Sequence, residues 1–207
     1  MTIQESQFPS EEIQKNHAIY LERSALYKEF GFDREEAEIK IVNCLLKDLR
    51  SILEIGTGKG YLTTMLAKSF DRVFSVDIDS NEQRIAGLNA AYYKQLNRIE
   101  FISADAGKLE YPDKSFDAVV SAFTFHHLEL PFKVLSEMIR LANRQVVISD
   151  FNRKGFDIVE KIHHREGKTH EIQSGHFDIV GVYLKEFNFN VKIFEYEHQI
   201  IYSAVKI

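Results

Sequence analysis

The hydrophobic positions between residues 51 and 150 form short apolar runs that alternate with longer amphipathic stretches. The runs at 118–120 and 146–148 are continuously apolar, which is typical of strands covered on both faces. Strands separated by helices predict βαβ units, and therefore a parallel sheet with right-handed crossovers. We expect strands at 51–55, 73–77, 99–103, 116–122 and 145–150, with helices at 59–70, 81–95 and 131–141.

The first part of the chain has a helical pattern instead. Ser10 is the expected N-cap of a helix that runs to about residue 30, and Gly31 follows where a helix end favours positive φ. Asp33 and Glu36 resemble the capping box of a second helix.

The end of the chain departs from the βαβ pattern. After a helix expected near 179–187, two strand-like runs at 191–196 and 200–206 are separated by only three residues. This spacing predicts an antiparallel hairpin. The expected fold is α/β, with N-terminal helices, five parallel strands and a C-terminal antiparallel hairpin.

Length and composition fit one domain. The chain has 207 residues, 44% of them hydrophobic, and a formal net charge of -5. We expect a single domain over 1–207, with a helical cap (1–48), a ligand-binding core (51–150), and C-terminal helices and hairpin (151–207). The mild charge gives no reason to expect a nucleic-acid or membrane partner. The single cysteine and the lack of a signal-like or membrane-spanning run predict a cytoplasmic protein.

The strongest local motif is a glycine-rich turn between a strand and a helix. Glu54 ends the strand, and Gly56, Gly58 and Gly60 follow at alternate positions. Such a turn lets a ligand approach the main chain closely and leaves N–H groups of the helix start available. A pyrophosphate would gain nothing from the Glu54 carboxylate, whereas a sulfonium or amino group would. Asp77, at the end of the next strand, suits ribose hydroxyls.

The glycine spacing argues against a dinucleotide. The NAD fingerprint G-x-G-x-x-G requires its third glycine where this chain has Tyr61, whereas here the spacing is G-x-G-x-G. A dehydrogenase is therefore a minor alternative.

The segment 51–150 resembles the class I, Rossmann-like S-adenosylmethionine methyltransferases, and within them the ubiquinone and menaquinone methyltransferases of the small-molecule branch. The matching stretches are LEIGTGKGYLT, VDID, FISADAGKLEYPDKSFDAVVSAFTFHHL and QVVISD. The resemblance implies a mostly parallel seven-stranded sheet, with S-adenosylmethionine as cofactor and S-adenosylhomocysteine as product.

The resemblance also implies residue roles. Asp77 would bind the ribose, Ile78 would pack on the adenine, and Asp105 would accept from the adenine amino group. For Asp105, a turn-capping role remains the alternative, and we expect Asp79 to cap a helix. The cofactor-binding residues implied are Glu54, Gly56, Thr57, Gly58, Gly60, Asp77, Ile78, Asp105, Ala106, Ser121 and Phe123.

Methyl transfer requires a base only if the acceptor arrives protonated. His126 and His127 are the candidate catalytic residues, and on an extended segment only one of them would face the ligand. The preceding Ser-Ala-Phe-Thr lacks the Asn/Asp-Pro-Pro-aromatic signature of many amino-group methyltransferases, and no cysteine lies there for a thiolate mechanism. A small-molecule acceptor is therefore expected.

Four histidines gather in the segment 161–176: His163, His164, His170 and His176. Their spacing matches no established metal signature, and Gly167 is expected to interrupt the helix. A solvated linker, a substrate contact and a metal site stay open, and no metal ligand is assigned. Methylation of RNA or protein, and a non-catalytic S-adenosylmethionine-binding module, remain the alternatives. Besides the acceptor, the only partner envisaged is a second copy in a homodimer.

Overall fold

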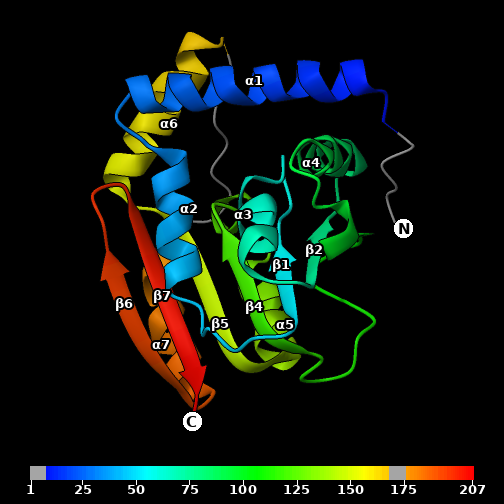
Figure 1. Cartoon of the computed structure of the whole chain (residues 1–207). Helices are drawn as coiled ribbons and strands as arrows, with labels where there is room; N and C mark the ends of the chain where they lie inside the picture. Colours follow the sequence, from blue (N-terminus) through cyan, green and yellow to red (C-terminus); the bar gives the residue numbers. More distant parts are fainter. Residues whose placement is uncertain (1–7, 168–175) are drawn as a thin grey trace.

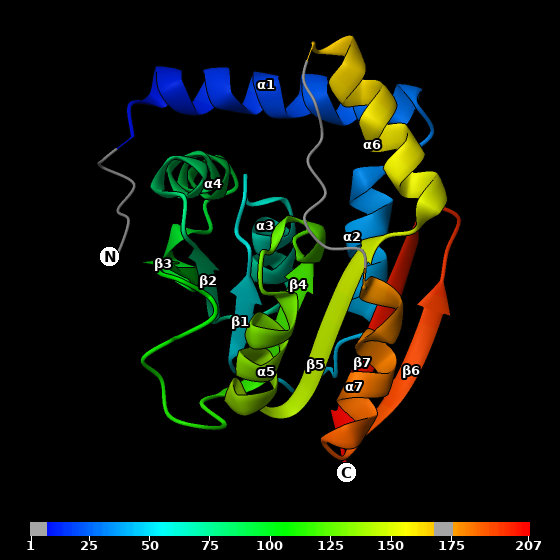
Figure 2. The same cartoon turned by 180° about the vertical axis from the view of Figure 1, so that it is seen from behind.

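The computed structural model describes residues 8–167 and 176–207, which form a seven-stranded sheet in the order β3-β2-β1-β4-β5-β7-β6 (Figures 1 and 2). Strands β1 to β5 are parallel, and β7 is antiparallel to both β5 and β6. The predicted parallel strands and terminal hairpin are therefore confirmed. The strands are β1 (Ile52–Ile55), β2 (Val73–Asp77), β3 (Ile99–Ser103), β4 (Phe116–Ala122), β5 (Ala142–Phe151), β6 (Phe189–Glu195) and β7 (Gln199–Lys206).

Helices cover both faces of the sheet. Alternate residues of β1 point in opposite directions, so Ile52 packs with α2, α3 and α4, whereas Leu53 packs with α5 and α7. These two apolar layers explain the continuously hydrophobic central strands. The helices are α1 (Ser10–Glu29), α2 (Arg34–Asn43), α3 (Tyr61–Ser69), α4 (Ser80–Tyr92), α5 (Pro131–Leu141), α6 (Arg153–Arg165) and α7 (Val180–Glu186).

Helix α1 lies across the carboxyl ends of the parallel strands, with α6 beside its C-terminal half (Figures 1 and 2). It docks on α4 through polar and aromatic contacts. Glu12 forms an ion pair with Arg84, and the buried His17 ring stacks on Tyr92 with centroids 3.4 Å apart. Helix α1 thus covers the edge of the sheet where α/β proteins bind ligands.

The predicted helix ends are mostly confirmed. Gly31 follows α1 with φ of +95°, and the Asp33 side chain accepts from the Glu36 backbone N–H at the start of α2. The predicted capping role of Ser10 is wrong. The first helix begins at Ser10 itself, with Pro9 as the cap residue, because the fixed φ of proline already sets the entry of the chain.

Candidate functional site

A cavity of about 790 Å³ opens at the carboxyl ends of β1, β2 and β4, beneath α1. One part is lined by the glycine-rich turn, by Asp77 with Ile78, and by the 104–107 loop. The other part is lined by α1, α2, α6 and the segment after β4. The volume is within the range of small-molecule sites, roughly 300–1,000 Å³.

Glycine occupies each of the three positions of the turn for a different structural reason. All have positive φ, which favours residues without a side chain. A Cβ on Gly56 would lie 2.2 Å from Thr124 Oγ1, and one on Gly60 would lie 2.7 Å from the Ala86 Cβ. A Cβ on Gly58 would meet no atom within 4 Å. Gly58 therefore borders open space, whereas Gly60 permits α3 to approach α4 and does not line the cavity.

Asp77 is oriented by the turn that it faces. Its Oδ2 accepts from the Gly58 backbone N–H at 2.7 Å, and its Oδ1 accepts from the Asp79 N–H at 3.0 Å. Ile78 beside it lines the cavity with 76% of its surface exposed. Asp79 accepts from the Asn81 N–H and caps α4, as predicted.

Glu54 is almost completely buried below the turn. Its Oε2 accepts hydrogen bonds from the hydroxyls of Thr63, at 2.5 Å, and Ser75, at 2.6 Å. Burial nevertheless raises the pKa of Glu54 to about 8, because desolvation of the charged form outweighs these two bonds. The Thr57 and Ser75 hydroxyl oxygens lie 2.7 Å apart and continue the network.

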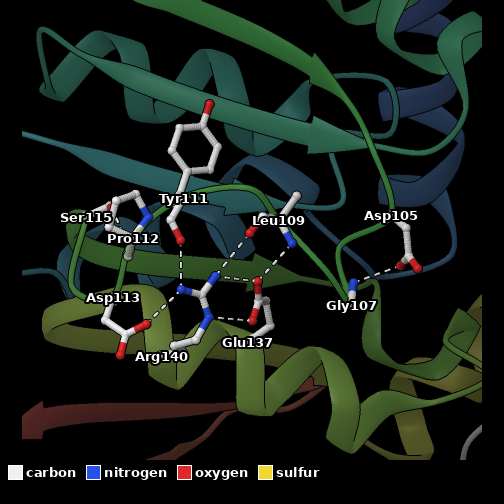
Figure 3. Close-up of polar contacts among 9 residues, drawn as sticks. All are labelled: Asp105, Gly107, Leu109, Tyr111, Pro112, Asp113, Ser115, Glu137 and Arg140. Carbon is white, nitrogen blue, oxygen red and sulfur yellow. Dashed lines mark hydrogen bonds and ion pairs between the residues drawn. The ribbon is translucent and has the colours of Figure 1, made fainter.

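Side chains on α5 hold the loop between β3 and β4, which includes the 104–107 turn (Figure 3). Asp105 Oδ1 accepts from the Gly107 N–H at 2.8 Å, and the Asp105 carboxylate lies 3.6 Å from Lys133 Nζ. Further along the loop, Arg140 donates to the Leu109 and Tyr111 carbonyls, as well as to the Asp113 and Glu137 carboxylates. Asp105 therefore shapes a turn and borders the cavity at the same time, so both interpretations of this residue match its position.

The segment after β4 turns sharply. Phe123 has φ of +53°, a conformation unusual for a bulky residue, and its ring stacks on Phe151 with centroids 4.5 Å apart. Ser121, expected among the cofactor residues, is buried, and its hydroxyl donates to the Ile55 carbonyl. Among the described residues Phe123 lines the cavity and Ser121 does not.

His126 and His127 lie on a short 3₁₀ helix (Phe125–His127), and both line the cavity. The expectation of an extended segment with one inward histidine is therefore wrong. Successive side chains of a 3₁₀ helix are about 120° apart rather than opposite, which follows from its three residues per turn. Their rings lie 4.0 Å apart, with His126 buried and His127 exposed.

Asp150, at the end of β5, holds His126 by two hydrogen bonds. Asp150 Oδ1 lies 2.7 Å from His126 Nδ1, and Asp150 Oδ2 accepts from the His126 backbone N–H at 2.9 Å. Both side chains are at most 2% exposed. A carboxylate on Nδ1 favours the tautomer whose basic nitrogen is Nε2.

Comparison with known proteins identifies the core. Residues 53–149 match the model of a family described as a methyltransferase domain. The structure also superposes on an S-adenosylmethionine-dependent methyltransferase of Aquifex aeolicus, with a TM-score of 0.65 over 97% of this chain and 100% of the other. The two sequences are 21% identical, so this similarity is one of fold. Residues 53–149 therefore match a methyltransferase domain, and the fold is shared with S-adenosylmethionine-dependent methyltransferases.

Two curated relatives share part of this methyltransferase domain. An rRNA adenine N-6-methyltransferase of Clostridium perfringens is 33% identical over 92 residues, which cover 42% of this chain and 36% of the relative. A demethylmenaquinone methyltransferase of Clavibacter sepedonicus is 31% identical over 124 residues, covering 53% of this chain and 47% of the relative. The chain thus matches less than half the length of each relative.

Several residues that line the cavity of the methyltransferase domain were missed by the sequence analysis. They come from the helices that cap it, and no local pattern marks them, because only the tertiary packing of α1, α2 and α6 brings them to the strand ends. Asp150 could have been suspected, since it is a carboxylate at the end of a buried strand. The missed lining residues of these helices are Arg23, Arg34, Glu38 and Val159, and Asp150 was missed as the partner of His126.

The histidine-rich segment divides into separate environments. Helix α6 ends at Arg165, and Gly167 follows with φ of +69°, as predicted. His163 lines the cavity, His164 is exposed, and His170 lies outside the described residues. No group of three or more histidine, cysteine or acidic side chains within 8–167 and 176–207 is arranged to hold a metal ion. None of the helices in these ranges is both long and apolar enough to cross a membrane.

Proposed function

We propose that the protein is an S-adenosylmethionine-dependent methyltransferase that acts on a small-molecule acceptor. The observation that carries the proposal is one continuous cavity that joins the glycine-rich turn and Asp77 to His126, whose ring is held from behind the cavity wall by Asp150. A cofactor at the strand ends and an acceptor beneath the cap would meet in this space.

The residues present fit the cofactor. Gly58 borders open space where a side chain would intrude, and the Asp77 carboxylate is already oriented towards the turn. The exposed Ile78 offers an apolar surface for an adenine ring, and Asp105 offers an acceptor for its amino group. When bound, S-adenosylmethionine supplies an electrophilic methyl group on a sulfonium whose leaving group is a neutral thioether.

The chain itself would position the acceptor and move a proton. His126 Nε2 would take the proton of an acceptor hydroxyl or amine, while Asp150 holds the ring and stabilises the imidazolium that forms. Phe123 and Phe151 would fix the plane of the acceptor. Helices α1 and α6 would exclude water, which strengthens these contacts and keeps the nucleophile aligned with the methyl group.

The charge of the cavity favours a small molecule over RNA. Its lining holds no excess of basic side chains, whereas binding of a polyphosphate backbone depends on such an excess. RNA is the alternative acceptor, because some of the relatives are rRNA adenine methyltransferases. The acidic lining residues are Glu38, Glu54, Asp77, Glu82, Asp105 and Glu129, and the basic ones are Arg23, Arg34, Lys59 and Lys133.

Titration calorimetry with S-adenosylhomocysteine tests the cofactor assignment. We expect micromolar or tighter binding to the intact protein, no binding of NAD, and affinity weakened about tenfold to hundredfold in Asp77→Asn, the usual scale for a hydrogen bond to a charged group. Asp79→Asn is the matched control, because asparagine also caps helices and Asp79 does not line the cavity. Failure of the intact protein to bind would refute the proposal.

Transfer of a labelled methyl group tests the acceptor. We expect label to enter the low-molecular-mass fraction of a cell extract and to depend on Asp77. Label in RNA or protein would assign the corresponding alternative instead. Binding of S-adenosylhomocysteine without transfer to any fraction would favour a non-catalytic binding module.

A further inference from the structure

Glu38 is a buried carboxylate that lines the cavity from helix α2. Its side chain is 2% exposed, yet among the described residues it accepts no hydrogen bond and forms no ion pair. By contrast, Glu54 on the other side of the turn accepts two hydroxyl hydrogen bonds. Burial raises the pKa of Glu38 to about 8, and the charge of Arg34 only partly opposes this.

Arg34 lies one turn before Glu38 on α2 and lines the same cavity. Its guanidinium lies over two aromatic rings, 4.6 Å from the centre of Tyr27 and 4.3 Å from that of Tyr61. No described carboxylate forms an ion pair with it, whereas Arg23 on α1 is paired with Glu166 at 2.6 Å. Residues at i and i+4 share one face of a helix, so α2 presents a guanidinium and a carboxyl group side by side.

Two such side chains destabilise the folded protein unless a ligand supplies the hydrogen-bonding partners that they lack. A buried charge without a hydrogen-bonding partner destabilises a folded protein, and natural cores seldom keep one. A ligand with one cationic and one anionic group, spaced as in an amino acid, would satisfy both side chains at once.

The position of the pair selects which end of the cofactor it meets. Asp77 and Asp105 lie at the ends of β2 and β3, on one side of β1 in the sheet order. Arg34 lies over Tyr61, the first residue of α3, and α2 packs against α3. If the adenosine part lies on the Asp77 side, the amino-acid part extends across the turn towards α2.

We propose that Glu38 and Arg34 form the subsite for the zwitterionic amino-acid end of the cofactor, with Glu38 accepting from the α-ammonium and Arg34 donating to the α-carboxylate. This assignment rests on the proposed function. It makes α2, which lies outside the segment 53–149, a part of the cofactor site.

The test is calorimetry with three ligands: S-adenosylhomocysteine, its deamino analogue S-(3-carboxypropyl)-5′-thioadenosine, and its decarboxy analogue S-(3-aminopropyl)-5′-thioadenosine. We expect Glu38→Gln to weaken the affinity for S-adenosylhomocysteine and for the decarboxy analogue about tenfold to hundredfold. The affinity for the deamino analogue should change by less than about threefold. Arg34→Gln should show the reverse selectivity and weaken the affinity for the two ligands that carry a carboxylate.

Glu35→Gln is the matched control, because Glu35 is an exposed glutamate on the same helix and does not line the cavity. Thermal unfolding of each ligand-free variant checks the fold, and Glu38→Gln should be at least as stable as the intact protein because it removes an unpaired buried carboxylate. Equal loss for all three ligands, or no loss in Glu38→Gln, would overturn the subsite while leaving the proposed function standing. If the intact protein fails to bind S-adenosylhomocysteine at all, both proposals fail.

Discussion

The hydrogen bond that the Asp150 carboxylate accepts from the His126 ring gives a prediction at the scale of single residues. Asp150→Asn removes the charge that fixes the histidine tautomer. We expect kcat for methyl transfer to fall on the order of 10²-fold, the scale of general base catalysis, while the Kd for S-adenosylhomocysteine changes less than about twofold. Turnover and calorimetry measured on the same preparation separate these two effects.

Asp117→Asn is the control for this prediction. Asp117 also accepts backbone N–H bonds, from Arg50 and Ser51, but it lies at the start of β4 away from the cavity. The Asp117→Asn variant should have a kcat within about twofold of that of the intact protein. An equal fall in both variants would mean that Asp150 acts only through the stability of the fold.

The buried Glu54 predicts that stability depends on pH. Its pKa of about 8 in the folded protein lies above the usual value of 4.5, so between these values the folded protein keeps a proton that the unfolded chain releases. The free energy of unfolding should therefore decrease as pH rises from about 5 to 8, with a limiting slope near 1.4 kcal/mol per pH unit for this group. Glu38 adds in the same direction.

Urea unfolding at a series of pH values measures this slope. Glu54→Gln should flatten it, because glutamine does not titrate while Thr63, Ser75 and Asp77 still surround the position. A slope that is the same in the variant and the intact protein would show that Glu54 is not the titrating group.

Residues that line the candidate cofactor site could be predicted where local backbone chemistry fixes them. Gly56 and Gly58 follow a strand and need positive φ, so the sequence alone located them. Glu38 and Arg34 could not be found, because on a helix of mixed polarity a charged residue is usually exposed. Only the docking of α2 beside α3 buries Glu38.

At the scale of elements, the loop between β3 and β4 depends on Arg140. Arg140→Met removes its bonds to the Leu109 and Tyr111 carbonyls and leaves Glu137 with only the hydrogen bond from the Leu109 backbone N–H (Figure 3). We expect a loss of about 2 kcal/mol in the free energy of unfolding and a weaker affinity for S-adenosylhomocysteine, because the same loop carries Asp105.

Arg144→Met is the matched control in the chemical unfolding experiment. Arg144 pairs only with the exposed Asp48 among the described residues, so its loss should change stability by no more than about 0.5 kcal/mol. Similar losses in both variants would contradict a special role for Arg140.

The elements between residues 51 and 150 could be predicted almost completely, because a covered parallel sheet has an unmistakable apolar pattern. Strand β5 is longer than expected, since it begins at Ala142 directly after α5 without a loop. The 3₁₀ helix that holds His126 was missed, because so short an element has no periodicity.

At the scale of the whole molecule, the cofactor should link the cap to the sheet. Ligand contacts to α2 and to the strand ends would bridge parts of the chain that otherwise meet only through packing. We expect S-adenosylhomocysteine to slow amide hydrogen exchange in α1, α2 and the turn after β1, and to leave α7 and β6 unchanged. Protection confined to residues 53–149 would contradict this coupling.

The layered architecture was predictable as a whole, but the position of α1 was not. The sequence showed that residues 10–29 are helical, yet polar and aromatic contacts such as His17 with Tyr92 join positions far apart in the chain. Contacts between residues far apart in the chain produce no periodic pattern in the sequence.

Strand β7 lies between β5 and β6, although it follows both in the chain. During synthesis on a ribosome, β5 and β6 therefore emerge before the strand that joins them, and one edge of β5 stays open until β7 arrives. The sheet can close only after residues 199–206 have left the exit tunnel. Nascent chains that stall before this point would present an apolar edge to chaperones and to one another.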